Sequence, residues 1–338
     1  MAKFSASSMS RRHFTILGII ITLAIWTFYY LSSGEVPPPI IDPSYGLLKE
    51  TSKDSKYAIA TFLNGDDRKP SYEKDRYFIA TRILTYQILH HNDTKCARNI
   101  PFLVAVTDTV SQEKRDRLTK DGATVVPVAD IPLRWWIKST VPRWKDQFTK
   151  LRLLQMTEYD RILFIDADGI LTRPIDAIFD EEIARVPAKT KFMLRSKIRG
   201  DEAQMPANYV FTARSDNQHN GRRNHPIPPI ATKGFSAGFW LAAPSEELFE
   251  YLMSIMDHWL RFNPNGMEQS LLNYAFRRDG AMPWGELDWH WSATWPGVQD
   301  LNAGIASLHE KFWATGPQKL RLLWFKWKKK MEAFHEGE

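Results

Sequence analysis

The chain has 338 residues, of which 43% are hydrophobic and 25% are charged, and its formal net charge is +6. This composition can supply a core and excludes a disordered chain, and the length suits one large domain or two small ones. The modest positive charge, without a basic module interleaved with aromatic residues, argues against nucleic-acid binding. A single cysteine, Cys96, excludes an intrachain disulfide, so cysteine pairing does not indicate the compartment.

The N-terminal segment has the pattern of a membrane anchor. An uncharged, largely apolar run covers residues 14–31, close to the ~20 residues that a helix needs to cross a bilayer. Its flanks are basic on one side and aromatic on the other: Lys3, Arg11 and Arg12, then Trp26, Tyr29 and Tyr30. The positive-inside rule then predicts a cytosolic N-terminus and a domain across the membrane. A cleaved signal peptide is the alternative, although no clear small-x-small cleavage site follows.

The chain divides into parts that differ in composition. We predict a cytosolic tail at 1–13, a signal anchor at 14–33, a Pro-rich stem at 34–55, a folded domain at 56–318 and a basic aromatic tail at 319–338. The tail sequence "KLRLLWFKWKKK" predicts a helix on an anionic membrane surface. A solvated tail and a helix packed in the core are the open alternatives.

One N-glycosylation sequon occurs, at Asn92, Asp93 and Thr94. Such tripeptides also arise by chance. The predicted orientation places Asn92 in the lumen, so we expect it to be available for glycosylation.

Within the folded domain, strand and helix patterns alternate. Strands are predicted at 57–63, 101–107, 123–128 and 161–165, and helices at 75–91, 111–121 and 147–159. This alternation predicts an α/β fold with a mostly parallel sheet flanked by helices. Ligands of such sheets bind at the carboxyl ends of the strands.

The order changes after residue 168. A long polar segment, 196–234, predicts either a functional lid or a disordered insertion. Its adjacent Arg222 and Arg223 make anion binding one interpretation, and a solvated loop is the other. A strand in "FSAGFWLAAP" and helices at 245–261 and 267–279 follow.

The stretch "RILFIDADGILTRP" ends an apolar strand with two carboxylates, Asp166 and Asp168. A buried carboxylate is costly unless a positive charge neutralises it, so we expect one nearby. On an extended backbone the two aspartates would face the same way, with Ala167 pointing back into the core. Two hard oxygen ligands suit Mg²⁺ or Mn²⁺ carrying a nucleotide diphosphate.

Two other interpretations of this stretch exist. The aspartates could be solvated at a strand end. "DADGIL" also looks like the first motif of haloacid-dehalogenase-type phosphatases, in which the first aspartate is a nucleophile and the second a general acid. That family opens its domain with this strand, whereas three predicted strands precede it here.

The stretch "FTKLRLLQMTEYDRILFIDADGILTRPIDAIFD" resembles the glycogenin-like family 8 glycosyltransferases, of the fungal membrane-anchored type. Further matching motifs follow in order: "FSAGFWLAAPS", "MEQSLLNYAF" and "NAGIASLHEKFW". Together they cover most of the chain from 57 to 313. The resemblance implies a GT-A fold and retaining, hexosyl-type transfer from a UDP-sugar to a carbohydrate or glycoconjugate acceptor, with Mn²⁺ (or Mg²⁺) and a Golgi location.

The resemblance also implies roles for single residues. Asp166 and Asp168 match the family's metal ligands, and His309, after the apolar "NAGIASL" strand, matches the third ligand. Lys150 matches a lysine that touches the donor. Outside this resemblance, Lys150 would be an ordinary surface lysine and His309 a core histidine.

Other matches concern catalysis and the donor. Glu268 and Gln269 fall where the family has an Asp-Gln pair near the sugar, which makes Glu268 a candidate nucleophile or charge-stabilising group. The residues that match donor-binding positions are Thr61, Phe62, Leu63, Tyr77, Ala167, Ser236, Ala237 and Gly238. For Thr61 to Leu63 and Tyr77, a strand end and a helix-face aromatic remain the alternative.

The chain departs from the family pattern at three positions. Ser236 replaces the usual asparagine, and Phe312 and Thr315 replace the glycine and lysine that follow the histidine. Lys311 is a candidate for the missing diphosphate contact. Four tryptophans could stack on sugar rings or lie in the core: Trp284, Trp289, Trp291 and Trp295. A lumenal phosphatase and an inactive sugar-binding protein are the alternatives to a transferase.

Overall fold

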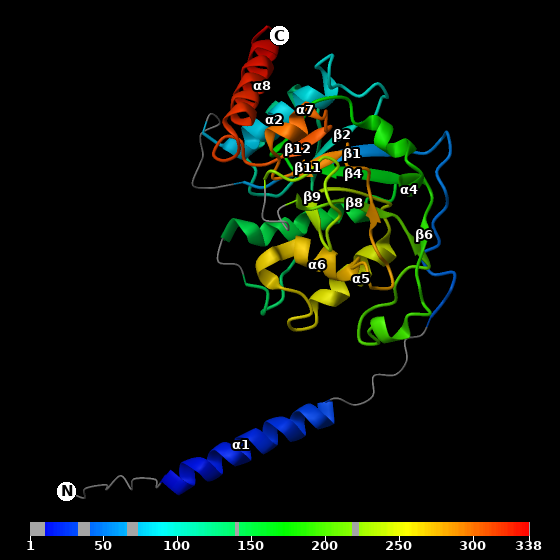
Figure 1. Ribbon diagram of the computed structural model, residues 1–338, viewed down its shortest axis with the longest axis vertical. Helices are drawn as coiled ribbons and strands as arrows, with labels where there is room; N and C mark the ends of the chain where they lie inside the picture. The colour runs from blue at the N-terminus through cyan, green and yellow to red at the C-terminus, as the bar shows by residue number, and fades with distance from the viewer. Residues whose placement is uncertain (1–10, 33–40, 66–73, 139–141, 218–222, 338) are drawn as a thin grey trace, which may run out of the picture. The chain divides into compact units, whose positions relative to one another are not determined.

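The structure is a computed structural model that describes residues 11–32, 41–65, 74–138, 142–217 and 223–337. The chain forms two units, Met1–Ile40 and Ile41–Glu338. Figure 1 shows the second unit as an α/β domain built around one central sheet. The α/β fold with helices on both faces of a sheet is therefore confirmed.

The first unit contains helix α1 (Arg11–Ser32), at the position of the predicted anchor. Its described apolar side chains are exposed: Ile16, Leu17, Ile19, Ile20, Ile21, Leu23 and Ile25. Across the part of the chain that the structure describes, no helix reaches the length and apolarity needed to cross a bilayer. The predicted transmembrane segment at 14–33 is thus not confirmed.

The central sheet of the second unit has seven strands in the order β10-β8-β9-β4-β1-β2-β3. Their bounds are Gly285–Glu286 (β10), Phe211–Ser215 (β8), Phe235–Ala242 (β9), Arg161–Ile165 (β4), Tyr57–Leu63 (β1), Phe102–Val106 (β2) and Thr124–Pro127 (β3). Strands β4, β1, β2 and β3 are parallel, as their continuous apolar sequences predict. Strand β9 is antiparallel to both of its neighbours, so the sheet is mostly rather than entirely parallel.

The predicted helices are present with somewhat different ends. They are α2 (Arg76–Leu89), α3 (Gln112–Lys120), α5 (Glu246–Met256) and α6 (Met267–Ala275). Asp75 caps α2 by accepting hydrogen bonds from the backbone N–H groups of Tyr77 and Phe78. The helix predicted at 147–159 is the 3₁₀ helix η1, Pro142–Gln155.

Shorter elements complete the domain. They are β5 (Gly169–Leu171), η2 (Asp176–Asp180), α4 (Glu182–Arg185), β6 (Ala188–Lys189), η3 (Arg195–Lys197), β7 (Asn208–Tyr209), η5 (Pro264–Gly266), β11 (Ser292–Thr294), α7 (Val298–Asn302) and β12 (Ser307–His309). Strands β11, β12 and β5 form a second, three-stranded sheet. This small sheet brings the C-terminal region back against the end of β4.

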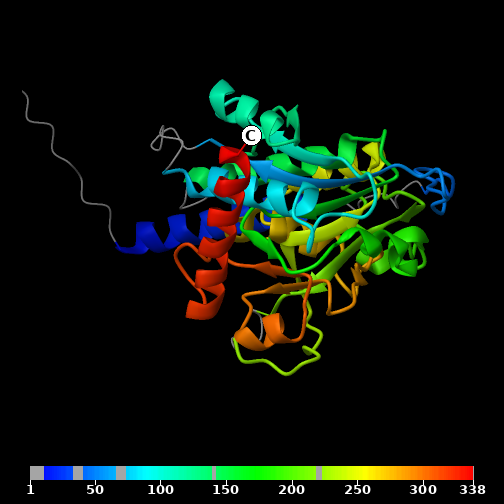
Figure 2. The same cartoon turned by 90° about the horizontal axis from the view of Figure 1, so that it is seen from above.

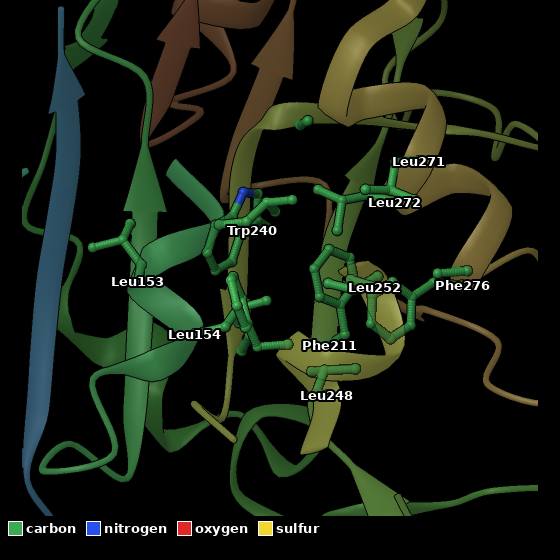
Figure 3. Close-up of a cluster of buried hydrophobic side chains, with 14 of the residues drawn as sticks. Leu153, Leu154, Phe211, Trp240, Leu248, Leu252, Leu271, Leu272 and Phe276 are labelled. Carbon is green, nitrogen blue, oxygen red and sulfur yellow. The ribbon is translucent and has the colours of Figure 1, made fainter. Parts of the chain in front are cut away.

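The core lies on both faces of the central sheet. Along β4, Ile162 and Phe164 belong to one apolar cluster, whereas Leu163 and Ile165 belong to another. Successive strand residues point to opposite faces, so one apolar strand contributes to both clusters. In Figure 3 side chains of η1, β8, β9, α5 and α6 meet in the first of these clusters: Leu153, Leu154, Phe211, Trp240, Leu248, Leu252, Leu271, Leu272 and Phe276.

The polar segment 196–234 is neither a lid nor a disordered insertion as a whole, because its middle supplies strand β8 of the central sheet. The sequence concealed this strand, since β8 contains the buried polar side chains of Thr212 and Arg214. Arg214 is neutralised by an ion pair with Glu286 of the neighbouring β10. A buried charge with a partner on an adjacent strand cannot be recognised from local periodicity.

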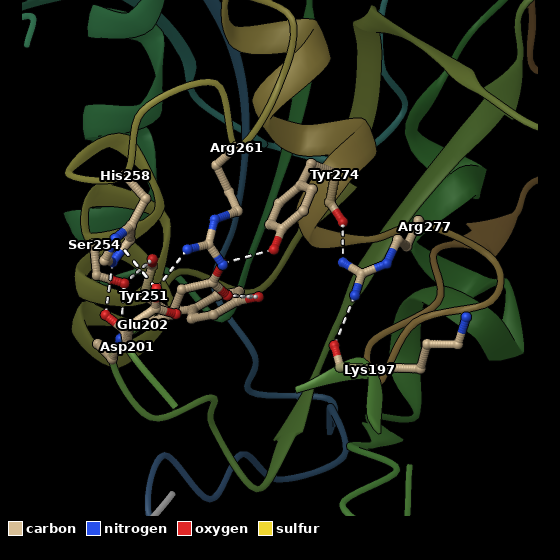
Figure 4. A network of polar contacts seen from close by, with 10 residues as sticks. Lys197, Asp201, Glu202, Tyr251, Ser254, His258, Arg261, Tyr274 and Arg277 are labelled. Atoms are coloured by element: carbon tan, nitrogen blue, oxygen red, sulfur yellow. Dashed lines mark hydrogen bonds and ion pairs between the residues drawn. The ribbon is translucent and has the colours of Figure 1, made fainter. Parts of the chain in front are cut away.

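A polar network holds the start of this segment against α5 and α6 (Figure 4). Arg261 pairs with Asp201 at 2.6 Å and with Glu202 at 3.0 Å, and the hydroxyl of Tyr274 donates to Glu202 at 2.6 Å. Nearby, the guanidinium of Arg277 donates to the carbonyl of Lys197 at 2.7 Å. These contacts fix the chain that leads into β8.

The C-terminal tail is part of the domain. It forms helix α8, Gln318–Glu336, which lies beside α2 (Figure 2). Its buried residues are Leu320, Trp324, Trp327, Met331 and His335. One face of this helix is thus packed in the core, as the core-packed alternative expects, and binding of the helix to a membrane surface stays a prediction. By backbone contacts the compact unit spans Ile41–Glu338.

Candidate active site

The strand order places a binding crevice beside β1. Strands β2 and β3 lie on one side of β1 and β4 lies on the other, so the chain order reverses between β1 and β4. Open α/β sheets bind ligands at the carboxyl ends of the strands at such a switch point. A cavity of about 400 Å³ opens there. Its lining includes Phe62 and Leu63 from the end of β1 and Asp166 to Asp168 after β4.

Asp166 and Asp168 converge through a turn and not along an extended strand. Strand β4 ends at Ile165, and the N–H of Gly169 donates to the carbonyl of Asp166 at 2.9 Å. The expected alternation of Asp166, Ala167 and Asp168 on a straight strand is therefore wrong, and Ala167 lines the cavity. The turn still directs both carboxylates to the same place.

His309 reaches this place from the small sheet. It is the last residue of β12, where the sequence had predicted it just after a strand, and it pairs with Gly169 of β5 in antiparallel register. Its Nε2 lies 2.9 Å from Asp168 Oδ1 and 3.6 Å from Asp166 Oδ2. One ligand atom from each of these three residues lies within 4.8 Å of the others.

Gly238 makes room for this cluster. A Cβ at this position would lie 2.6 Å from Nδ1 of His309 and 2.9 Å from Oδ2 of Asp166. The carbonyl of Gly238 also accepts the N–H of Asp166 at 2.8 Å. A larger residue at position 238 would therefore displace two members of the cluster, Asp166 and His309.

Lys150 lies behind the cluster in the buried interior. Its Nζ is 3.0 Å from Asp166 Oδ1 and 2.9 Å from Glu268 Oε1, and it lies 4.9 Å from the ring centre of Phe164. Burial alone would lower the pKa of Lys150, but the two carboxylates outweigh it and hold that pKa above its usual range. Burial raises the pKa of Glu268, although Lys150 acts in the opposite direction.

Asp168 is held in its ionised form. Burial opposes ionisation, but His309, Lys311 and Lys150 together hold the pKa of Asp168 well below its usual range. Lys311 Nζ lies 3.6 Å from Asp168 Oδ2, and Lys311 lines the cavity. The positive charge that the sequence required beside the two aspartates is thus supplied by these three side chains.

Asp166, Asp168 and His309 fit a divalent metal. Two carboxylate oxygens and an imidazole nitrogen converge, and such a set suits Mn²⁺ or Mg²⁺ with positions left for other oxygens. The Nδ1 atom of His309 is buried without a hydrogen-bond partner, so the ring is oriented by packing against Gly238 and by its contacts through Nε2.

The structure gathers most of the predicted site residues but not all of them. Those that line the cavity are Phe62, Leu63, Tyr77, Asp166, Ala167, Asp168, Glu268, Gln269 and His309. Thr61, Lys150, Ser236, Ala237 and Gly238 do not line it. Gln269 accepts the N–H of Ala237 at 3.0 Å, which ties α6 to β9 at the cavity wall.

Several aromatic candidates lie elsewhere. None of Trp284, Trp289, Trp291 and Trp295 lines the cavity, and Trp284 and Trp291 are buried. The burial of Phe312 explains why this family departure is tolerated, since its ring belongs to the apolar cluster beside α8.

Sequence reasoning missed other residues of the cavity lining: Asn64, Gly65, Asp75, Gln147, Asn265, Gly266 and Met267. Asn64 and Gly65 directly follow β1, so the strand-end rule could have found them. The residues around η5 gave no such signal, because a short 3₁₀ turn has no hydrophobic period.

A comparison with protein-family models matches residues 71–305 to the model described as glycosyl transferase family 8. This range contains both aspartates, Lys150, Glu268 and Gln269. His309 and Lys311 follow its end.

Relatives differ in how much of the chain they share. An uncharacterized protein of Schizosaccharomyces pombe is 31% identical over 299 residues, which are 80% of this chain and 79% of that protein. The inositol phosphorylceramide glucuronosyltransferase 1 of Arabidopsis thaliana is 27% identical over 135 residues, 38% of this chain and 21% of that protein. Among solved structures, the glycosyltransferase GlyE of Streptococcus pneumoniae matches with a TM-score of 0.47 and 15% identity, over 81% of this chain and 61% of GlyE.

Proposed function

This chain belongs to glycosyl transferase family 8, and we propose that it transfers a hexose from a UDP-sugar to a carbohydrate or glycoconjugate acceptor with retention of configuration. The observation that carries this proposal is the convergence of Asp166, Asp168 and His309 in a cavity at the switch point of the sheet. A nucleoside diphosphate needs positive charge, and the cavity offers a metal-ligand set with Lys311 beside it.

The proposed metal is Mn²⁺, with Mg²⁺ as the alternative, held by Asp166, Asp168 and His309. When bound, such an ion acts as a Lewis acid on the leaving diphosphate. Lys311 faces the same cavity and adds positive charge where the diphosphate would lie. Lys150 would contribute indirectly, since its single ammonium group orients both Asp166 and Glu268.

Glu268 and Gln269 are the proposed catalytic residues. Both line the cavity, and the Lys150 contact fixes the carboxylate of Glu268 beside the aspartate pair. A carboxylate in this position can stabilise positive charge that develops on the sugar ring during transfer. Phe62, Leu63 and Tyr77, at the other end of the lining, are proposed to contact the base and ribose.

A type II topology with a lumenal domain in the Golgi stays a prediction from the sequence. Thr94 of the sequon is buried, and its hydroxyl donates to the carbonyl of Gln87 at 2.7 Å. Glycosylation of Asn92 would therefore have to precede folding of this turn. Protease protection of the domain in closed microsomes, with a glycosidase-sensitive mass shift, tests both predictions. Digestion of the domain from outside would contradict the orientation.

Family membership and topology leave no support for the phosphatase alternative. The phosphatase motif belongs to the first strand of its domain, whereas β1, β2 and β3 precede β4 here. An inactive sugar-binding protein would still bind UDP-sugars through the same cavity. Turnover therefore has to be measured directly.

The decisive experiment measures UDP release over a panel of UDP-sugars, with Mn²⁺ and with EDTA. We expect release with a restricted set of donors, its loss in EDTA and its return with added Mn²⁺. His309→Ala should raise the Mn²⁺ concentration that gives half-maximal UDP release by at least tenfold, since one of the ligands is removed. Donor binding without turnover would indicate a sugar-binding protein. A trapped phosphoaspartate at Asp166 would indicate a phosphatase.

A further inference from the structure

The chain between β8 and β9 carries an arginine that faces the segment bearing His309. We propose that Arg223 is a positioning residue for the candidate metal site: by holding Glu310, it fixes the two residues on either side, His309 and Lys311, against Asp168. The effect of Arg223 on sugar transfer rests on the proposed function. Its contacts, however, can be tested without turnover.

The guanidinium of Arg223 binds both carboxylate oxygens of Glu310. Nη2 lies 2.9 Å from Oε1, and Nη1 pairs with Oε2. Nη1 also donates to the carbonyl of Pro296 at 3.0 Å, and the guanidinium lies 4.7 Å from the ring centre of Trp295. A planar fork with two parallel bonds sets direction as well as distance, which a lysine could not do.

The alternation of side chains along this segment connects the ion pair to the site. His309 and Lys311 both approach Asp168, through contacts of 2.9 Å and 3.6 Å, while Glu310 between them turns to Arg223. Strand β12 ends at His309 and the chain bends at Glu310, where the N–H of Phe312 donates to the Glu310 carbonyl at 2.8 Å, so these side-chain directions belong to a local turn. The ion pair between Arg223 and Glu310 therefore also restricts the two neighbouring residues, His309 and Lys311.

Backbone hydrogen bonds join the same parts. The N–H of Glu310 donates to the carbonyl of Asp168 at 3.4 Å, and the N–H of Trp295 donates to the carbonyl of His309 at 3.1 Å. Trp295 directly follows β11 and Glu310 directly follows β12. Arg223 contacts both, so one guanidinium holds the ends of these two neighbouring strands. The ligand-bearing strand is thus held from outside the cavity.

Arg223 is itself held in place. Its carbonyl accepts from the side chain of Gln299 at 2.7 Å. Two residues further along, His225 lies 3.1 Å from both the carboxylate of Asp300 and the amide of Asn217, and these side chains are buried. The segment that presents Arg223 is therefore anchored, which argues against the solvated-loop interpretation.

Loss of the arginine would leave a carboxylate without its partner. The side chain of Glu310 is only 8% exposed, so it would have to turn toward water or draw another cation. For the Glu310 carboxylate to reach water, the 309–311 segment would have to shift. Because residues that orient metal ligands typically affect metal affinity ten- to hundredfold, we expect roughly a tenfold effect here.

The test compares Mn²⁺ affinity of the whole protein in Arg223→Met and in a matched control, Arg277→Met. The two arginine side chains are similarly exposed, at 26% and 24%. Each lies 4.7 Å from an aromatic ring and donates to a backbone carbonyl. Only Arg223 contacts the segment that carries His309. We expect the Kd for Mn²⁺ to rise roughly tenfold in Arg223→Met and to stay within twofold in Arg277→Met.

Two further measurements separate positioning from general destabilisation. Glu310→Gln should weaken Mn²⁺ binding as Arg223→Met does, and the double variant should be no worse than either single one. Amide exchange over residues 307–312 should accelerate in Arg223→Met and not in Arg277→Met, whether or not the protein turns over a UDP-sugar. Equal exchange and equal Mn²⁺ affinity in the two arginine variants would overturn the proposal. Failure of transferase activity with these differences intact would overturn only the proposed function.

Discussion

Two clusters of buried charge in this domain differ in composition and in geometry. Asp121, at the end of α3, is fully buried. It pairs with Arg82 at 2.5 Å and with Arg117 at 2.8 Å. His335 of α8 lies 3.4 Å from its carboxylate. One carboxylate is thus surrounded by cationic side chains from different helices. This cluster joins α2, α3 and α8, and its cationic side chains also line a cavity of about 550 Å³.

The candidate site has as many carboxylates as cationic side chains. Asp166, Asp168 and Glu268 share Lys150, His309 and Lys311, and the two aspartates converge on one point of a cavity wall. Crowded carboxylates that open into a cavity can accept a further cation. The comparison teaches that a buried charge by itself does not mark a site. The convergence of two carboxylates and an imidazole on one point of a cavity wall does.

The largest expected effect separates the clusters by activity. Asp168→Asn should lower UDP release from a UDP-sugar by about 10³-fold, because it removes a charged ligand of a metal that contributes several kcal/mol to the transition state. Folding should survive at reduced stability, since the amide keeps the shape while His309 and Lys311 lose a charged partner. Thermal unfolding and UDP release on the same preparation check this. Full activity in a folded Asp168→Asn protein would remove the metal-site assignment.

The second prediction concerns the Asp121 cluster, where we expect a loss of stability with little loss of activity. Asp121→Asn should lower the free energy of unfolding by about 4 kcal/mol, because the guanidinium groups of Arg82 and Arg117 lose their buried counter-charge. Activity per folded molecule should change little. Urea unfolding and Mn²⁺-dependent UDP release provide the measurements. A strong loss of activity in the folded fraction would show that α8 and its anchoring cluster act on the site.

The comparison also shows what sequence could and could not reveal. The strand that ends at Ile165 and the aspartates after it were predictable, because an apolar run followed by Asp-Ala-Asp is a local pattern. The turn that brings Asp168 beside Asp166 was not, since it depends on Gly169 starting a strand of another sheet. His309 was found only through motif order in a family resemblance.

Contacts between distant segments account for the remaining errors. Strand β8 was hidden because Arg214 is buried and paired with Glu286, which lies far along the chain. The tail at 319–338 combines basic residues with large aromatics, which favours a membrane surface, and the sequence does not show that Trp324 and Trp327 pack in the cluster that includes α2. Neither the Arg223 contact to Glu310 nor the position of Lys150 behind the aspartates has a local signature.

The third prediction tests whether the site can exchange a protein cation for a metal. Lys150→Met should lower the free energy of unfolding by about 3 kcal/mol in EDTA, because Asp166 and Glu268 lose their shared partner while the apolar stem over Phe164 is kept. Saturating Mn²⁺ should recover part of this loss by binding to the folded state. The same addition should not rescue Asp121→Asn. Equal Mn²⁺ responses of the two variants would remove the distinction between the clusters.

The smallest effect concerns pH. Burial raises the pKa of Glu268 above its usual value of 4.5, so in the folded protein this carboxyl binds its proton more tightly than in the unfolded chain. Its contribution to stability is therefore fully present below the unfolded pKa and is lost as pH rises through the folded pKa. Glu268→Gln, which stays uncharged, should lack this component.

We therefore expect wild type to lose stability relative to Glu268→Gln as pH rises through the window just above 4.5, by about 1 kcal/mol for each unit of pKa elevation. Urea unfolding of both proteins in EDTA across this window measures the difference, since a bound metal would alter the charge balance beside Lys150. A stability difference between wild type and Glu268→Gln that grows in the opposite direction would mean that Lys150 outweighs burial. Glu268 would then be an ordinary ion-pair partner of Lys150, like Asp121 among its arginines, and not a carboxyl whose burial dominates its pKa.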